Sequence, residues 1–101
     1  MTIPIRVAQQ FSRYPAGRYL EDGPYSGQHF RDKFLVPYIQ DGTTITIYLD
    51  GTRGYGSSFL EEAFGGLVRI GFPATTIRNL VELVSADSSL TQEIWDYVDH
   101  V

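Results

Sequence analysis

The stretch from Tyr48 to Arg69 constrains the fold more than any other part of the chain. It predicts the end of a strand, then a glycine-rich turn, then an amphipathic helix that two serines open. The strand spans Thr43 to Leu49, where β-branched and aromatic residues follow one another without a charge. Such a run favours a central strand that is covered on at least one face.

The helix after the turn is predicted from about Ser58 to Ile70, because its apolar residues recur at helical spacing. Ser58 and Glu61 have the spacing of a capping box. Gly71 and Pro73 follow the last turn and end the helix. The whole unit is therefore a strand, a turn and a helix that packs on the sheet.

Two adjacent glycines, Gly65 and Gly66, interrupt this helix on its polar side, near Glu61, Glu62 and Arg69. Each glycine costs about 1 kcal/mol relative to alanine inside a helix, so the pair needs a reason. One explanation is close packing against another element of the same chain. The other is a smooth patch where the backbone of a partner approaches.

The N-terminal third predicts two strands and a helix. Residues 3–8 alternate apolar with other residues, and Pro4 suggests either the start of a strand or an edge strand. Gly17 to Glu21 is expected to form a second strand that pairs with the first strand in a hairpin. Ser26 is the expected N-cap of a helix that ends near Leu35 or continues to Gln40, because Pro37 disrupts a helix interior.

The C-terminal part predicts a strand and a last helix. Leu80 to Val84 favours a strand, although a helix from Thr76 is an alternative. Asp87 and the serines after it cap the final helix, with Ser89 and Gln92 in the spacing of a capping box. The order of elements predicts one α/β domain over residues 1–101, with a small mixed four-stranded sheet packed against about three helices.

Composition excludes several classes of function. The net charge of −4 argues against a nucleic-acid binder, which needs a clustered positive surface. The chain has no Cys, which excludes disulfides and thiolate chemistry. No apolar run approaches the roughly 18 residues of a membrane span, and no secretory signal opens the sequence. We therefore expect a cytoplasmic protein that binds neither membrane nor nucleic acid.

No arrangement of residues predicts catalysis, a metal or a cofactor. Ser57 follows a Gly-Tyr-Gly run, but Phe59 stands where a nucleophile elbow requires its second glycine. Only His29 and His100 could act as a base. The glycine-rich turn lacks the lysine of a phosphate-binding loop and the third glycine of a dinucleotide motif. An enzyme is the least supported of three functional hypotheses.

Ser57 and Ser58 stand where the helix begins, and this position favours negative charge. A phosphoryl group there would be tolerated locally and would add about −1.5 to −2 charge to the surface. The alternative interpretation is that Ser58 only caps the helix and Ser57 faces solvent. Both interpretations stay open for Ser57.

The stretch ITIYLD, which ends in Asp50, and the sequence Gly-Ser-Ser-Phe at residues 56–59 resemble the STAS domain of anti-sigma factor antagonists. In those antagonists a central strand ends in Asp, and an Asp-Ser-Ser-Gly or similar motif opens the next helix. Ser57 falls at the position of the serine that the family kinases phosphorylate. Gly56 and Phe59 depart from the motif.

The chain more closely resembles STAS-like bacterial domains of unknown function. The segments GRYLEDGPYSGQHFRD, LDGTRGYGSSFLEEAFGGLVR and ELVSADSSLTQEIWDYV carry this resemblance over nearly the whole length. It implies a STAS-like fold and, by analogy with the antagonists, a histidine-kinase-type ATP-binding protein as partner.

We therefore expect a non-enzymatic regulatory module, a phospho-switch that acts on a kinase-like partner through residues 54–69. The alternative is a constitutive assembly or inhibitor protein, either a homodimer or a subunit of a larger complex, with phage or host-defence roles left open. The candidate phosphorylation sites are Ser57 and Ser58. The candidate partner-binding residues are Asp50, Tyr55, Gly56, Glu61, Glu62, Gly65, Gly66 and Arg69.

Overall fold

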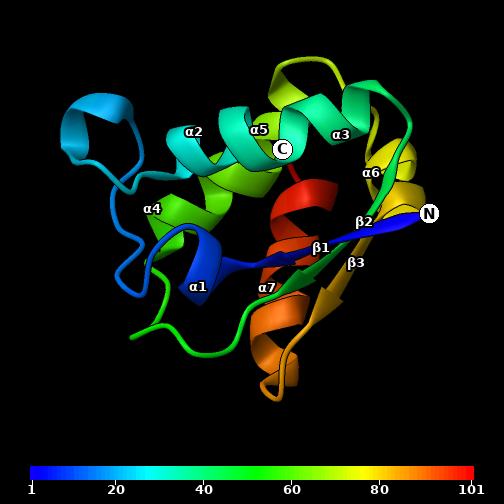
Figure 1. The fold of residues 1–101 in the computed structure, drawn as a ribbon. Coiled ribbons are helices and arrows are strands. Elements are labelled where there is room, and N and C mark those ends of the chain that lie inside the picture. The colour runs from blue at the N-terminus through cyan, green and yellow to red at the C-terminus, as the bar shows by residue number, and fades with distance from the viewer.

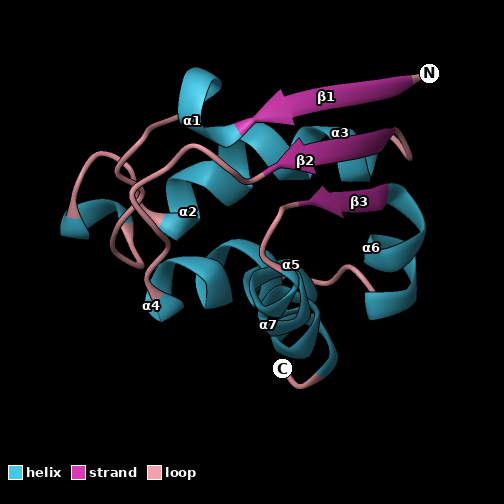
Figure 2. Cartoon of the chain, turned by 90° about the horizontal axis from the view of Figure 1, so that it is seen from below, coloured by secondary structure: helices cyan, strands magenta, loops and turns pink.

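Three parallel strands form the sheet in a computed structural model that describes residues 1–101 (Figure 1). The strands β1 (Thr2–Arg6), β2 (Thr44–Tyr48) and β3 (Val81–Val84) lie in the order β1-β2-β3 (Figure 2). In the register, Ile47 of β2 pairs with Ile5 on one side and with Leu83 on the other. The predicted central strand is confirmed, but a mixed sheet of four strands packed against about three helices is wrong.

The missing strand is the predicted return at Gly17 to Glu21, which instead forms a turn with the short helix η1 (Leu20–Asp22). The Asp22 carboxylate accepts hydrogen bonds from the backbone N–H groups of Arg18 at 3.1 Å and Tyr19 at 2.8 Å. These local bonds occupy the donors that a neighbouring strand would need. The segment therefore cannot join the sheet.

Two long helices lie on one side of the sheet (Figure 1), and each contains one π-helical turn at its middle. The first long helix comprises α2, η2 and α3. The second, which we call the junction helix, comprises α4, η3 and α5. The helical segments are α1 (Val7–Gln10), α2 (Gly27–Phe30), η2 (Arg31–Leu35), α3 (Val36–Gln40), α4 (Ser57–Leu60), η3 (Glu61–Gly65), α5 (Gly66–Arg69), α6 (Ala74–Leu80) and α7 (Ser88–Asp99).

The first long helix starts as predicted, because the Ser26 side chain accepts a hydrogen bond from the His29 N–H at 3.2 Å. Of the two predicted ends, the helix takes the later one at Gln40. The Val36 N–H bonds the carbonyl of Arg31, five residues back, so the π turn directly precedes Pro37. The helix thus changes its hydrogen-bond spacing where the proline removes a donor.

Neither predicted capping box forms. The junction helix begins one residue early, with Gly56 as its N-cap and no side-chain cap. At α7 the cap is Asp87, whose carboxylate accepts from the Ser89 N–H at 3.0 Å, so Ser89 and Gln92 do not cap each other. The predicted strand near Leu80 is confirmed at β3, and the preceding residues form the helix α6.

One face of the sheet supplies the core. Ile5, Ile45, Ile47 and Leu49 are almost completely buried, and Phe59 of the junction helix belongs to the same cluster. The alternate residues of the strands point to the other face. On that face Thr2, Arg6 and Glu82 are exposed, as an alternating pattern predicts. The long helices therefore pack on one face of the sheet and hold the start of the junction helix at the end of β2.

Candidate functional site

The candidate site is the turn from Asp50 to Gly56, here called the junction turn, which joins β2 to the junction helix (Figure 1). It lies at the carboxyl end of the parallel sheet, where open α/β sheets place their binding crevices. The Arg53 N–H donates to the Arg13 carbonyl at 2.8 Å, which ties the turn to the loop after β1. The loops that follow β1 and β2 are therefore one connected surface.

Asp50 ties the junction turn to the loop after β3. Its carboxylate accepts hydrogen bonds from the Ser85 hydroxyl at 2.7 Å and from the Ala86 N–H at 2.8 Å. These two hydrogen bonds hold the pKa of Asp50 below its ordinary value, so the side chain stays charged. Asp50 remains exposed, and its predicted contact with a partner stays a prediction.

Tyr55 anchors the other end of the turn. Its hydroxyl donates to the Leu49 carbonyl at 2.6 Å, and its ring lies 5.9 Å from the ring of Phe59. Burial raises the pKa of Tyr55 to about 12. The phenol therefore stays a hydrogen-bond donor over the ordinary pH range and keeps its bond to the Leu49 carbonyl.

Replacing Tyr55 with Phe is expected to lower the free energy of unfolding by about 1 kcal/mol, because the Leu49 carbonyl loses its donor. The wild type should also lose stability as the pH rises from 10 to about 12, the ordinary and folded-state pKa values of Tyr55. In that interval the folded state still binds the proton and the unfolded state has released it, so stability falls. Urea unfolding at several pH values measures both effects.

The matched control is Tyr14→Phe, since the Tyr14 side chain is 61% exposed. This variant should keep both the stability and the alkaline loss of the wild type. If Tyr55→Phe shows the same alkaline loss as wild type, then Tyr55 does not anchor the turn.

The junction itself lies at the surface. Gly56, Ser57 and Ser58 are all exposed, and a Cβ added at Gly56 would meet no atom within 4 Å. The first N–H groups of a helix have no acceptor within the helix, so they are available to an incoming group. Ser57 and Ser58 are therefore accessible to another protein, as the phosphorylation hypothesis requires.

The predicted residues further along the junction helix are mostly not accessible. Glu62 is 6% exposed, and Gly65 and Gly66 are buried. A Cβ at Gly65 would lie 3.2 Å from the Tyr97 carbonyl oxygen of α7, and one at Gly66 would lie 2.8 Å from Arg31. Of the two explanations for the paired glycines, close packing against other elements of the same chain is confirmed, and a smooth exposed patch is wrong.

The side chains that surround these glycines form an ion-pair network. Glu62 pairs with Arg31, with Arg69 at 3.0 Å and with Arg18 at 3.4 Å. Glu61 pairs with both Arg18 and Arg69 at 2.5 Å. The hydrogen bond from Arg69, followed by that from Arg18, holds the pKa of Glu61 below its ordinary value. The network joins the junction helix to the loop after β1 and to η2.

Sequence reasoning did not single out Arg18 and Arg31. They lie 43 and 31 residues before their glutamate partners, and no spacing rule links residues so far apart. One signal in the sequence pointed to these partners. Two adjacent acids in an amphipathic helix cannot both face solvent fully, so one of them needs a basic partner within the chain.

No side chains converge on a reaction centre at the junction. The His29 ring hydrogen-bonds the Pro24 carbonyl at 2.7 Å, and the His100 ring hydrogen-bonds the Asp96 carbonyl at 2.9 Å, so neither ring bonds a serine. No group of three His, Cys, Asp or Glu side chains is placed to hold a metal ion. No helix is both long and apolar enough to cross a membrane.

Comparison with protein families matches residues 26–91 to a model described as a STAS-like domain of unknown function. The chain belongs to this family. The match spans the first long helix, β2, the junction turn, the junction helix and β3, so the resemblance to STAS-like domains of unknown function is confirmed over these residues. In this STAS-like chain β1 and the loop through Tyr25 precede the matched residues. Neither a curated protein nor a solved structure matches the chain.

Proposed function

We propose that this STAS-like domain is a non-enzymatic regulatory module that docks a protein partner at the junction turn. The observation that carries the proposal is the exposure of Ser57 and Ser58 at the start of a helix whose preceding turn is anchored at both ends. An anchored surface costs little conformational entropy when a partner binds. An anchored, accessible junction therefore suits docking.

The finer proposal is a phospho-switch on a kinase-like ATP-binding partner in the cytoplasm. A phosphate on Ser57 would lie at the N-terminus of the junction helix, where the helix dipole favours an anion. It would add about −1.5 to −2 charge to the docking surface without entering the core. The partner would contact the predicted residues that stay accessible, which are Asp50, Tyr55, Gly56, Glu61 and Arg69. The predicted residues that are buried would instead hold the helix in place, and these are Glu62, Gly65 and Gly66.

Replacing Ser57 with Asp is expected to weaken partner binding about tenfold, because the added charge changes the potential of the docking surface. The partner is first isolated by its co-purification with the wild-type chain and is then titrated calorimetrically against each variant. Ser57→Ala should bind like the wild type. Ser88→Asp is the matched control, because Ser88 is also exposed and is the first residue of a helix.

If Ser57→Asp binds as tightly as Ser57→Ala, the phospho-switch is wrong. If Ser88→Asp weakens binding equally, the effect reflects total charge and the docking site is not at Ser57.

A second candidate function is constitutive assembly, and a cluster of exposed apolar side chains in the loop after β1 favours it. Tyr14, Tyr19, Leu20 and Tyr25 are between 42% and 61% exposed. Aromatic residues are enriched in protein interfaces. Light scattering that shows a concentration-independent dimer would favour this function, and a monomer would count against a homodimer.

A further inference from the structure

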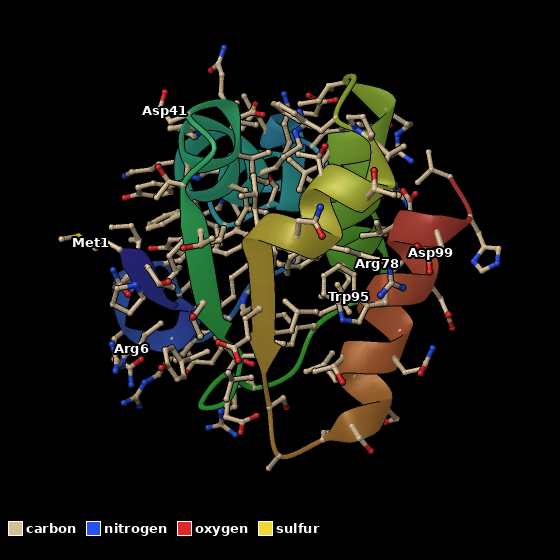
Figure 3. The ribbon with its side chains drawn as sticks, turned by 90° about the vertical axis from the view of Figure 1, so that its right-hand side faces the viewer. Met1, Arg6, Asp41, Arg78, Trp95 and Asp99 are labelled. Atoms are coloured by element: carbon tan, nitrogen blue, oxygen red, sulfur yellow. The ribbon has the colours of Figure 1, made fainter.

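The basic residues of this chain fall into two sets. Four arginines, at positions 18, 31, 69 and 78, form ion pairs with carboxylates. Arg78 is an example of the paired set: it pairs with Asp99 at 2.5 Å and lies over the ring of Trp95 (Figure 3). The other four basic residues are Arg6, Arg13, Lys33 and Arg53, and they take part in no ion pair.

Three of these four residues lie on contacting segments at the carboxyl end of the sheet. Arg6 is the last residue of β1, and its guanidinium lies 4.7 Å from the ring centre of Tyr48 at the end of β2. Figure 3 shows Arg6 on the opposite side of the molecule from the Arg78 pair. Arg13 and Arg53 lie on the two loops that the backbone hydrogen bond joins at 2.8 Å.

A second contact holds the same segments together. A Cβ added at Gly51 would lie 3.2 Å from the Cβ of Ala8, so α1 packs against the junction turn. We call Arg6, Arg13 and Arg53 the arginine edge. All three are exposed, and the nearest acid of the turn, Asp50, is occupied by Ser85 and Ala86 on the β3 side.

Three exposed arginines that form no ion pair therefore lie on contacting segments of a chain whose net charge is −4. Guanidinium groups bind carboxylates through paired hydrogen bonds, and arginine and tyrosine are the residues most enriched among energetically important interface positions. Tyr14, next to Arg13, is 61% exposed. The edge therefore offers positive charge, and an exposed aromatic residue follows one of its arginines in the sequence.

We infer that the arginine edge binds an acidic segment of the protein partner, with aspartate or glutamate side chains facing the three guanidinium groups. The inference rests on the proposed docking function and names the chemistry of the partner. It also gives the phospho-switch a physical cause. Arg53 lies on the junction turn and Ser57 is the first residue of the helix after it, and the proposal includes competition between a phosphate on Ser57 and the acidic segment for the edge.

The test is a titration of the ¹⁵N-labelled chain with a peptide of ten glutamates at low salt, followed by NMR. Amide shifts are expected in residues 6–14 and 50–57. Arg53→Glu should weaken the peptide affinity about fivefold, whereas the control Lys33→Glu, which makes the same charge change, should alter it less than about twofold. Added salt should weaken binding, because exposed charges are screened.

The inference is overturned if the two variants weaken binding equally, if the shifts lie elsewhere, or if no shift occurs at low salt. It is also overturned if a ten-nucleotide single-stranded DNA binds about tenfold more tightly than the peptide, since the edge would then favour phosphodiesters. The calorimetric comparison of Ser57→Asp with Ser57→Ala stays independent, because it uses the isolated partner and can fail while the peptide maps to the edge.

Discussion

Replacing Glu62 with Gln is expected to lower the free energy of unfolding by about 3 kcal/mol. Glu62 is buried and lies among the guanidinium groups of Arg31, Arg69 and Arg18. Glutamine keeps the shape of the side chain but removes the negative charge, so Arg31, whose side chain is only 10% exposed, keeps only the exposed Asp32 as a counter-charge. Urea unfolding, followed by circular dichroism, measures the change in midpoint and slope.

The control for this variant is Asp99→Asn, which also removes a carboxylate from an arginine. The Arg78–Asp99 pair is exposed and screened by solvent, so its loss should lower the free energy of unfolding far less than the loss of the Glu62 charge. Equal costs for the two variants would mean that the buried network contributes no more than a surface pair. A large cost for Glu62→Gln alone would show that the network holds the junction helix against the first long helix.

Replacing Gly27 with Ala is expected to lower stability by a similar amount, about 3 kcal/mol. A Cβ at this position would lie 2.4 Å from the Phe59 carbonyl oxygen and 3.1 Å from the Ala63 nitrogen. Both atoms belong to the backbone of the junction helix, so the two long helices would have to move apart. Helix propensity alone predicts the opposite sign, because alanine favours a helix more than glycine does.

Gly56→Ala is the matched control for Gly27→Ala. Gly56 has a φ of −69°, which suits any residue, and its added Cβ would meet no neighbour. The free energy of unfolding of the Gly56→Ala variant should differ from that of the wild type by less than about 1 kcal/mol. If Gly27→Ala is as stable as Gly56→Ala, the helices are not held in contact at Gly27.

Much of the fold could be predicted because local patterns and tertiary packing agree. The uncharged run of β2 is central in the sheet, and the cap at Ser26 forms as expected. The strand predicted at Gly17 to Glu21 does not form, because the side chain of Asp22 accepts hydrogen bonds from two backbone N–H groups of this segment. β-propensity takes no account of such bonds between a side chain and the backbone. No residue pattern distinguishes a π turn from an α-helix, so η2 and η3 could not have been foreseen.

The position of the candidate site in the chain could be predicted, but the side chains that pack around it could not. The glycines and serines predicted a turn that opens the helix, and Gly56, Ser57 and Ser58 are exposed there, because a short turn reaches the surface at the end of a strand. Which side of the junction helix meets solvent depends on Arg31 and on the end of α7 near Tyr97. These contacts join residues far apart in sequence, and periodicity within one helix carries no information about them.

The parallel pairing of all three strands has a consequence for how the chain reaches its native state. No two strands are joined by a hairpin, since one long helix separates β1 from β2 and a second separates β2 from β3. During synthesis β2 therefore has no complete set of neighbours until Val84 has left the ribosome, and such distant pairing forms slowly. Until then the uncharged TITIY segment is available to other nascent chains, so low temperature and dilution should improve the yield of native protein.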